Sequence, residues 1–275
     1  MQNKESSILV CCHKKDYFYD GDGYIPIHVG KANSQIDLGI LGDDTGDNIS
    51  VKNPNFCELT AHYWLWKNGI KTKYVGLCHY RRYFSFYRNS IVRGGFLVSQ
   101  QEIKDNPPKL PDLDNLLKNH DIILPKPYFA PYSLETTYCM AHVKNDIDIL
   151  REVVEKKYPD YIPSYDKVMR WSNRLCPYNM FITSWEYFEE YSKWLFDILF
   201  EVERRIKLSA YPDQARVFGY MSERLLNVFV KNKKLRVKEL PILMVTDQPN
   251  ESLQKVIFQR LRNYISAQLT YPYFK

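Results

Sequence analysis

The stretch Lys73-Tyr-Val-Gly-Leu-Cys-His-Tyr80 is apolar and partly β-branched, and it runs directly into Arg81-Arg-Tyr-Phe84. Its first part predicts a buried strand, so the arginines come at the point where that strand ends. Ser7-Ile-Leu-Val-Cys-Cys12 has the same character and is followed by the polar segment 13–15. Because ligands of α/β sheets collect at the carboxyl ends of strands, both basic segments are candidates for a binding site.

Further strands and helices alternate along the chain, which predicts an α/β domain with helices flanking a central sheet. We expect strands at residues 25–29, 121–125 and 178–183, and helices at about 55–68, 112–119, 145–156, 186–207 and 215–232. The helix at 55–68 is apolar nearly all round, so we expect it to be buried. No repeat or low-complexity linker divides the sequence. We therefore expect one domain over residues 1–275, with the C-terminal helical part, about 185–275, packing on the sheet.

The composition excludes several classes of protein. The 275 residues include 22 Tyr, 14 Phe and 5 Trp, which are too many rings for a disordered chain. The 11 glycines form neither a dinucleotide-binding pattern nor a P-loop. No apolar run reaches the roughly 20 residues that span a bilayer, and the first residues are polar, so we expect a cytoplasmic protein. The six cysteines form no C-x-x-C pair, so we expect neither disulfides nor a zinc site.

The net charge of +6 is unevenly distributed along the chain. Residues 1–60 carry a net charge of −4, and the rest of the chain carries +10. Residues 67–109 contain nine basic and two acidic side chains, and residues 231–238 contain five basic side chains without an acidic one. Such patches suit phosphates, acidic lipid headgroups or nucleic acid.

The segment His79-Tyr80-Arg81-Arg82 carries the densest set of hydrogen-bond donors at a predicted strand end. Guanidinium groups bind phosphate oxygens in a bidentate manner, so this segment, with His13 and Lys14, suits a diphosphate. The alternative is a solvated basic turn, and the residues alone leave both interpretations open.

An acidic loop follows the second predicted strand. Asp43, Asp44, Asp47 and Asn48 offer oxygens and an amide for sugar hydroxyls or for a cation, and the alternative is a solvated turn. The D-x-D pattern, which can hold a metal, occurs at residues 20–22, 112–114 and 146–148. The second and third occurrences fall in predicted helices, where alternate residues point apart.

Two carboxylates lie on otherwise apolar helices, Glu58 and Glu223. Burial raises the pKa of a carboxyl group and suits it to act as a general base. An ion pair of Glu223 with Arg224 or Arg216 is the alternative. Trp171 lies in a polar segment, where its ring would stack on a sugar, and the other tryptophans are expected in the core.

The same segments resemble a family of bacterial glycosyltransferases encoded in capsule and O-antigen loci, long known only as a domain of unknown function. The resemblance covers most of the chain, in the order of the family, and its most specific segment is Cys-His-Tyr-Arg-Arg-Tyr-Phe. The matching stretches are Tyr24–Gly30, Asp44–Ser50, Asn55–Thr60, Tyr63–Asn68, Gly76–Phe84, Asn179–Ile182 and Glu223–Leu226.

The resemblance implies a GT-A-like nucleotide-sugar-binding fold with a mixed central sheet. It further implies an inverting hexosyltransferase that uses UDP-galactofuranose, with a galactosyl or glucosyl transferase of the same pathway as the alternative. In the family, the Cys78–Arg82 segment replaces the metal-binding D-x-D, so His79, Arg81 and Arg82 would neutralise the leaving UDP without a metal cofactor. A divalent cation at Asp20, Asp22, Asp43 or Asp44 stays open.

The placement of these groups at strand ends leads to a hypothesis for how the substrates would be arranged. The UDP-sugar would lie over the first strand near Lys14 and the acidic loop, and Glu223 or Asp44 would deprotonate the acceptor. The acceptor would be a lipid-diphosphate-linked oligosaccharide that contacts Trp171 and Asn179. This reading implies a UDP-sugar and a lipid-linked acceptor as partners, and no nucleic acid.

Two other expectations concern binding surfaces. The basic run 231–238 and the mixed apolar and basic segment 253–264 suit the inner face of a membrane, and a solvated face with a packing helix is the alternative. The basic and aromatic segment 80–88 would also suit single-stranded nucleic acid, although no RNA-binding motif is present. A third candidate is a catalytically silent sugar-binding relative.

Overall fold

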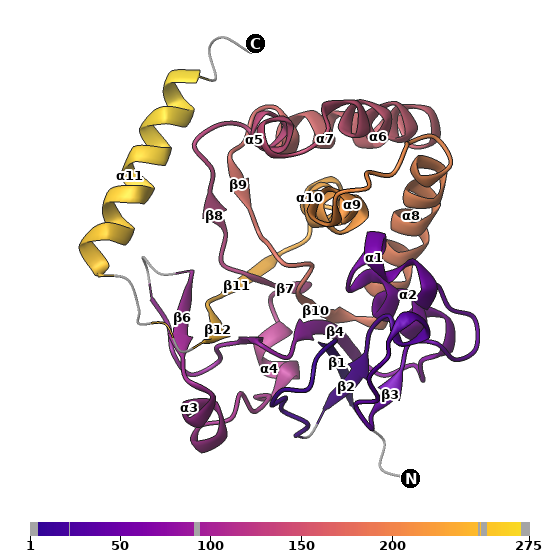
Figure 1. Ribbon diagram of the computed structural model, residues 1–275. Helices are drawn as coiled ribbons and strands as arrows, with labels where there is room; N and C mark the ends of the chain where they lie inside the picture. The colour runs from indigo at the N-terminus through magenta and orange to yellow at the C-terminus, as the bar shows by residue number, and fades with distance from the viewer. Residues whose placement is uncertain (1–4, 22, 91–93, 247, 249–251, 271–275) are drawn as a thin grey trace.

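A mixed sheet lies at the centre of the molecule (Figure 1). The computed structural model describes residues 5–21, 23–90, 94–246, 248 and 252–270. Within this part of the chain, the main path of the sheet runs in the order β11-β7-β10-β4-β1-β2-β3, and β5, β6 and β12 pair beside it. The strands are β1 (Ser6–Cys12), β2 (Tyr24–His28), β3 (Leu41–Gly42), β4 (Tyr74–His79), β5 (Arg82–Phe84), β6 (Gly95–Val98), β7 (Ile122–Pro125), β10 (Phe181–Ser184), β11 (Val237–Leu240) and β12 (Ile242–Val245).

Both faces of β1 are buried, as its unbroken apolar run predicts. Leu9 and Cys11 belong to the core cluster on the side of the long helices. Ile8 and Val10 belong to the cluster on the opposite face of the sheet. The sheet is therefore covered on both sides, and polar groups are left for its edges.

The centre of the sheet is parallel, and this brings several strand ends together. β1 pairs in parallel with β2 and β4, and Cys11 lies opposite His79. On its other side, β4 pairs antiparallel with β10. A Cβ on Gly76 would lie 2.3 Å from the carbonyl oxygen of Phe181, so this close approach of β4 and β10 requires glycine.

The chain reverses immediately after β4, which the sequence did not predict. β5 pairs antiparallel with β4, with His79 opposite Arg82, and also pairs with β12. The basic segment 79–82 is thus split: Tyr80 and Arg81 form the turn, and Arg82 begins the returning strand. The turn holds the arginines at the carboxyl edge of the sheet.

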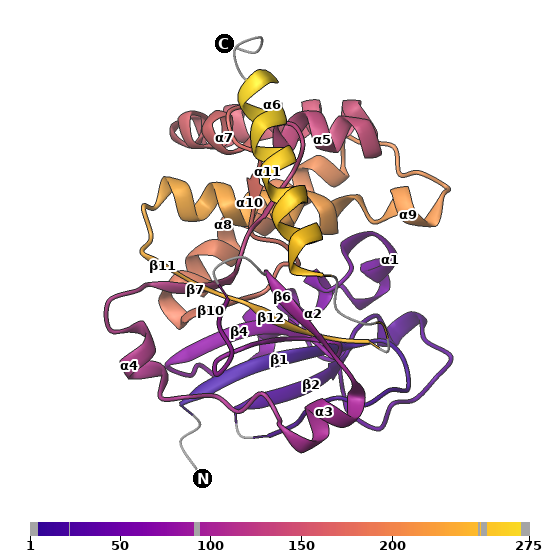
Figure 2. The same ribbon diagram turned by 90° about the vertical axis from the view of Figure 1, so that its left-hand side faces the viewer.

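Most helices form layers over one face of the sheet (Figures 1 and 2). The helices of the described residues are α1 (Asn53–Phe56), α2 (Leu59–Asn68), α3 (Gln100–Asp105), α4 (Leu113–Leu117), α5 (Leu134–Ala141), α6 (Lys144–Lys157), α7 (Ile162–Met169), α8 (Trp185–Glu203), α9 (Pro212–Ala215), α10 (Val217–Asn232) and α11 (Leu253–Thr270), with short 3-10 turns at Lys31–Asn33, Ser50–Lys52 and Pro159–Tyr161. The short helices α3 and α4 pack on the opposite face of the sheet. α8 and α10 pack between the sheet and the outer helices α5, α6 and α7.

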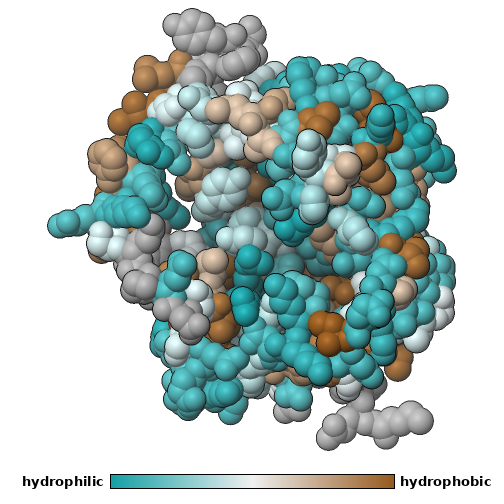
Figure 3. All heavy atoms as spheres, in the orientation of Figure 1, coloured by the Kyte–Doolittle hydropathy of each residue, from teal (hydrophilic) through white to brown (hydrophobic). Residues whose placement is uncertain are grey.

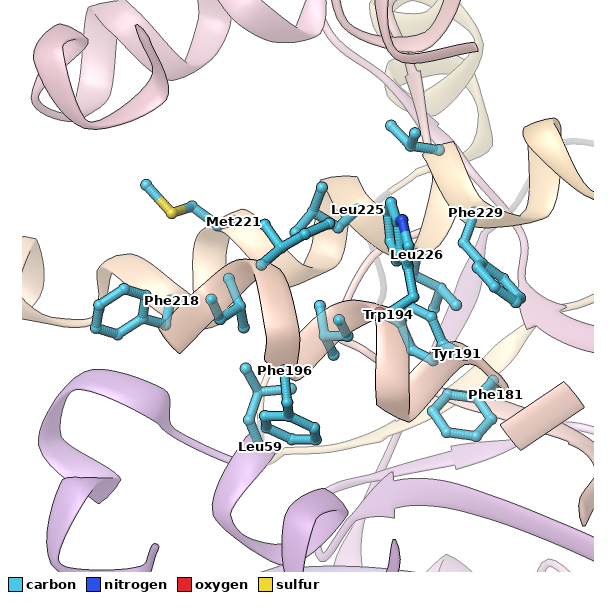
Figure 4. Packing of buried hydrophobic residues seen from close by; sticks show 14 of the residues in the cluster. Leu59, Phe181, Tyr191, Trp194, Phe196, Phe218, Met221, Leu225, Leu226 and Phe229 are labelled. Atoms are coloured by element: carbon cyan, nitrogen blue, oxygen red, sulfur yellow. The ribbon is translucent and has the colours of Figure 1, made fainter. Parts of the chain in front are cut away.

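The interior of this helical layer is aromatic. Figure 4 shows Tyr191 and Trp194 from α8 beside Phe229 from α10, and Phe196 of α8 beside Leu59 of α2. The predicted helix at 55–68 is buried here but is divided, because Cys57 adopts a φ of 52° between α1 and α2. His62 on α2 is buried in the same core, as a structural histidine would be.

α11 lies apart from the main sheet. It runs beside β8 (Tyr128–Phe129), which pairs with β9 (Arg174–Leu175) in a separate two-stranded sheet (Figure 1). Among the described residues, no helix combines the length and the apolar character that crossing a membrane requires.

Candidate active site

A cavity of about 620 Å³ lies at the carboxyl ends of β1 and β4, beneath α1 and the start of α10. This face of the molecule is hollowed between the sheet and the helices (Figure 3). The residues that carry its polar chemistry come from five separate segments of the chain. They are His13, Glu58, His79, Arg81, Arg82, Tyr178, Arg216 and Glu223.

Arg82 supplies positive charge inside this cavity. Its guanidinium carbon lies 4.6 Å from the centre of the Tyr178 ring. The Nε atom is buried without a hydrogen-bond partner, and Arg82 forms no ion pair with any residue that the structure describes. A buried donor without an acceptor costs about 1–3 kcal/mol. A guanidinium in this arrangement can bind an anion without first breaking an ion pair.

Two further arginines line the cavity. Arg216 donates a hydrogen bond from Nε to Cys57 Sγ over 3.4 Å and has no ion pair within the described residues. Arg81 donates to Asp16 from Nε over 2.8 Å and from a terminal nitrogen. Arg81 is more than half exposed, so this ion pair is open to competition by a ligand.

Two partly buried carboxylates, Glu58 and Glu223, line the same cavity as the arginines. Glu58 Oε1 accepts a hydrogen bond from Asn179 Nδ2 over 2.6 Å, and Glu223 Oε1 accepts one from the Tyr178 backbone N–H over 2.9 Å. Burial raises the pKa of both carboxyl groups. The charge of Glu58 raises the pKa of Glu223 further, while Arg224, 3.7 Å from Glu223 Oε2, opposes this rise. Carboxylates with raised pKa values are suited to accept a proton near neutral pH.

A left-handed turn immediately before β10 connects these groups. Tyr178 and Asn179 have φ values of 74° and 53°, which cost about 1–3 kcal/mol for residues other than glycine. The predicted strand at 178–183 therefore begins only at Phe181. The turn presents the Tyr178 N–H to Glu223 and its carbonyl oxygen to His79, and directs the Asn179 side chain to Glu58.

His79 is held as a neutral imidazole. Burial, with help from the charge of Arg82, lowers the pKa of His79 to about 4. Its Nε2 lies 2.8 Å from the Tyr178 carbonyl oxygen, which only accepts, so Nε2 carries the proton. Nδ1 is then a hydrogen-bond acceptor, and the ring adds no positive charge at neutral pH.

The acidic loop at 43–48 does not line the cavity, and its side chains accept hydrogen bonds from within the protein. Buried Asp43 accepts hydrogen bonds from the backbone N–H groups of Gly30 and Lys31, over 2.8 and 3.1 Å, and from Ser50 Oγ. Asp47 accepts from the Tyr63 hydroxyl over 3.0 Å, and Asn48 accepts from the Ser50 N–H over 3.1 Å. Asp44, which is exposed, does not line the cavity, and neither does Lys14.

The two predicted acceptor contacts are also separated. Asn179 is buried, and its side chain bonds to Glu58, to the Gly219 carbonyl oxygen over 3.2 Å and to Ser222 Oγ. Trp171 is half exposed in a second cavity of about 860 Å³. Lys231 and Lys234 of the basic run line this second cavity with Trp171.

The D-x-D patterns do not form a metal site among the described residues, which contain no cluster of three or more His, Cys, Asp or Glu side chains arranged to hold an ion. Asp112 caps α4 by accepting from the Asn115 N–H over 3.1 Å, and the pattern at 146–148 lies within α6. Asp22 of the first pattern lies outside the described residues.

Three residues of the cavity lie outside the binding set that the sequence predicts: Glu58, Tyr178 and Arg216. The sequence indicates Glu58 only as a base and Arg216 only as an ion-pair partner of Glu223. A helical signal was present for Arg216, because Arg216, Tyr220 and Glu223 are spaced i, i+4, i+7 and share one helix face. No local pattern marks Tyr178, whose role depends on its backbone conformation.

Comparisons with known proteins agree with this architecture. The chain is similar to the apo structure of the bifunctional glycosyltransferase WbbM, with 32% sequence identity and a TM-score of 0.80. The likeness covers 90% of this chain and 47% of that chain, so the chain spans about half the length of this relative. A search among curated proteins found no match. The mixed sheet with flanking helices and this likeness confirm the expected GT-A-like α/β fold.

A family model, that of the domain of unknown function DUF4422, matches residues 7–234. The match includes β1 except for Ser6, all of β4, the reversing turn and all of the charged residues that line the first cavity. It ends within the connection between α10 and β11, before α11. Since it covers most of the sequence, the chain belongs to the DUF4422 family.

Proposed function

We propose that this chain is an inverting glycosyltransferase that moves a hexosyl unit, galactofuranose, from a UDP-sugar to a lipid-diphosphate-linked oligosaccharide. Its likeness to a bifunctional glycosyltransferase supports the reaction class. The observation that carries the proposal is that one cavity combines Arg82, which lacks an ion pair within the described residues, with two carboxylates whose pKa values are raised. These are the groups that a leaving diphosphate and an incoming hydroxyl require.

The arginines would hold the diphosphate of the donor. Arg82 and Arg216 have no ion pair within the described residues, and Arg81 would exchange its contact with Asp16 for a phosphate oxygen. Asp16 would keep its hydrogen bond from Gln100 Nε2, which is 2.9 Å long. Positive charge fixed beside the breaking bond stabilises the leaving group without reorganisation. We propose that this charge takes the place of a metal ion.

The remaining predicted residues would surround the nucleotide and the sugar. His13 lines the cavity, and its ring meets the Tyr80 ring edge to face at 5.4 Å. Lys14 follows β1, the loop at 43–48 follows β3, two strands further along the sheet, and both would approach the nucleotide from outside the cavity. Neutral His79 would accept a hydrogen bond at Nδ1 from a donor hydroxyl.

Glu223 would act as the general base. As the acceptor oxygen attacks the anomeric carbon, its proton passes to the Glu223 carboxylate, and the bond from that carbon to UDP breaks with its electron pair leaving on UDP. Glu223 lines the cavity whereas Asp44 does not, and this favours Glu223 of the two predicted candidates. Asn179 and Glu58 would position and tune this site, and Trp171 would contact a more distant part of the acceptor.

The experiment is a panel of UDP-galactofuranose, UDP-galactose and UDP-glucose, in which UDP release is measured with and without EDTA. We expect release from UDP-galactofuranose, unchanged by EDTA. Faster release from a pyranose donor would favour the galactosyl or glucosyl transferase. Donor binding without UDP release from any sugar would contradict the transferase and favour a silent sugar-binding protein, and salt-sensitive binding to single-stranded nucleic acid would contradict both.

Substitutions test which carboxylate is the general base. We expect Glu223→Gln to lower kcat about 10²- to 10⁴-fold, the usual contribution of a general base. Glu201→Gln is the matched control, because Glu201 is an outlying helix residue that pairs with Arg204. A larger loss for Asp44→Asn than for Glu223→Gln would assign the base to Asp44 instead.

A further inference from the structure

We propose that α11 is an interfacial helix that lies on an anionic lipid surface, with its apolar face inserted between the headgroups. The inference goes beyond glycosyl transfer, because it concerns a part of the chain outside the family match and away from the cavity. It rests on three properties of the helix: which side chains are exposed, how α11 is attached to the rest of the molecule, and its charge.

The exposed side of α11 is apolar. Phe258 is 66% exposed, Leu269 66%, Tyr264 58% and Leu261 55%. The exposed large apolar side chains of this helix are Leu253, Ile257, Phe258, Leu261, Tyr264, Ile265 and Leu269. At about 100° per residue they occupy one continuous arc of about 160°, interrupted only by glutamines. Figure 3 shows brown, hydrophobic surface where α11 lies.

The opposite side of α11 is attached to the protein. Asn263 Nδ2 donates a hydrogen bond to the Phe129 carbonyl oxygen over 2.7 Å, and the guanidinium of Arg260 lies 5.6 Å from the centre of the Phe129 ring. Ala267 is buried. These contacts orient the helix, so the exposed apolar arc faces away from the protein.

The charge of α11 identifies the surface that it fits. The helix carries Lys255, Arg260 and Arg262 and no acidic residue. On the helical wheel, Arg262 and Lys255 follow one border of the apolar arc, and Arg260 lies at the other. Cations beside an apolar face are typical of helices that lie in the headgroup region of anionic membranes. A soluble anionic partner would satisfy the cations but leave the rings exposed.

α11 would lie on the membrane and would not cross it. Its 18 residues span about 27 Å, but the helix is too polar to be a membrane-spanning segment. Such a contact would hold the cavity close to a membrane surface. A lipid-linked acceptor would then be presented at high local concentration.

The test uses the full chain and vesicles of phosphatidylcholine, with and without phosphatidylglycerol. We expect sedimentation with the anionic vesicles, weakened by salt and absent with phosphatidylcholine alone. Leu261→Ser with Ile265→Ser should reduce vesicle binding at least tenfold, and Lys255→Glu with Arg262→Glu should abolish the preference for anionic lipid. Ile70→Ser is the matched control, because Ile70 is 85% exposed at a site away from α11.

Each outcome bears on one proposal at a time. Unchanged vesicle binding by the α11 variants would overturn the inference, as would a concentration-dependent dimer that the Leu261→Ser and Ile265→Ser changes disrupt in the absence of lipid. UDP release with a soluble acceptor should be the same in all of these variants. A chain that binds vesicles but releases no UDP would contradict the proposed function and leave the membrane contact intact.

Discussion

The Nε atom of Arg82 is buried without a hydrogen-bond partner among the described residues, which is energetically unfavourable. Tyr178 covers the guanidinium, and the surrounding residues supply no acceptor within the described part of the chain. Binding of a diphosphate would remove the cost of this unsatisfied donor. The residue is therefore more informative about function than Arg81, whose charge Asp16 already balances.

We expect Arg82→Ala to lower kcat about 10²- to 10³-fold, the loss seen when one preorganised donor to a developing charge is removed. The measurement is the initial rate of UDP release. Arg204→Ala is the matched control, since it removes an arginine that pairs with Glu201 on the surface. Equal rates for Arg82→Ala and the control would refute the diphosphate assignment.

The interaction between the two carboxylates predicts a pH effect. Burial is the main reason that the pKa of Glu223 is raised, and the charge of Glu58 adds to it. Glu58→Gln removes that charge and keeps an oxygen for Asn179, so the pKa of Glu223 should fall. We expect the acidic limb of the kcat/KM profile to move to lower pH. A limb that stays in place, or moves to higher pH, would contradict this coupling.

The raised pKa of Glu223 also predicts a stability effect. The pKa of this carboxyl group is higher in the folded state than in the unfolded state, where it is about 4.3. At a pH above that value the group therefore destabilises the folded state, because folding disfavours its ionised form. Glu223→Gln should therefore raise the melting temperature at neutral pH, and the gain should shrink as the pH falls toward that value. A gain that is the same at every pH would indicate better packing instead of charge removal.

At the scale of elements, the approach of β4 to β10 positions the site. Both the His79 side chain and the turn at 178–179 depend on this pairing, and the pairing depends on the missing side chain at Gly76. Two strands distant in sequence are thereby held in the one register that joins His79 to the Tyr178 carbonyl oxygen.

We expect Gly76→Ala to destabilise the protein by about 1–3 kcal/mol, the range for an overpacked core, because the new methyl group meets the Phe181 carbonyl oxygen. Chemical denaturation measures this change. In the control Gly94→Ala, the nearest atom lies 3.7 Å from the new Cβ, and stability should change little. If Gly76→Ala had the same denaturation midpoint as the wild type, β4 and β10 would accommodate the methyl group without loss of stability, which would contradict this prediction.

Elements also show where sequence patterns failed. The helix at 55–68 had one continuous apolar pattern, yet Cys57 breaks it with a left-handed residue. The break turns Glu58 toward Asn179. Propensity describes each residue in isolation, so it does not detect a conformation that is stabilised by a contact with residue 179.

For the whole molecule, the aromatic core between α1, α8 and α10 connects the two walls of the cavity. The rings of Phe56 and Phe218 stack with centroids 4.3 Å apart. Phe56 lies two residues before Glu58, and Phe218 lies two residues after Arg216. The stack thus sets the distance between an acidic and a basic group of the site.

We expect Phe218→Ala to destabilise the protein by about 3–5 kcal/mol, as large-to-small changes in a core do. UDP release should fall as well, measured at a temperature where the variant remains folded. Ile198→Ala, in the same core but away from the cavity, is the control for stability loss alone. Equal loss of activity in the two variants would argue against a role of the stack in spacing the site.

The sequence by itself determined the buried strands β1 and β4, the basic residues that follow them, and the long helices α6, α8 and α10. These features depend on local periodicity, which neighbouring residues set. Only the tertiary structure decided that Glu58 and Glu223 meet in one cavity, that Asp43 serves the backbone, and that Arg82 lies on a returning strand. The physical reason is that burial, pKa and hydrogen-bond partners come from residues far apart in the chain, which packing alone brings together.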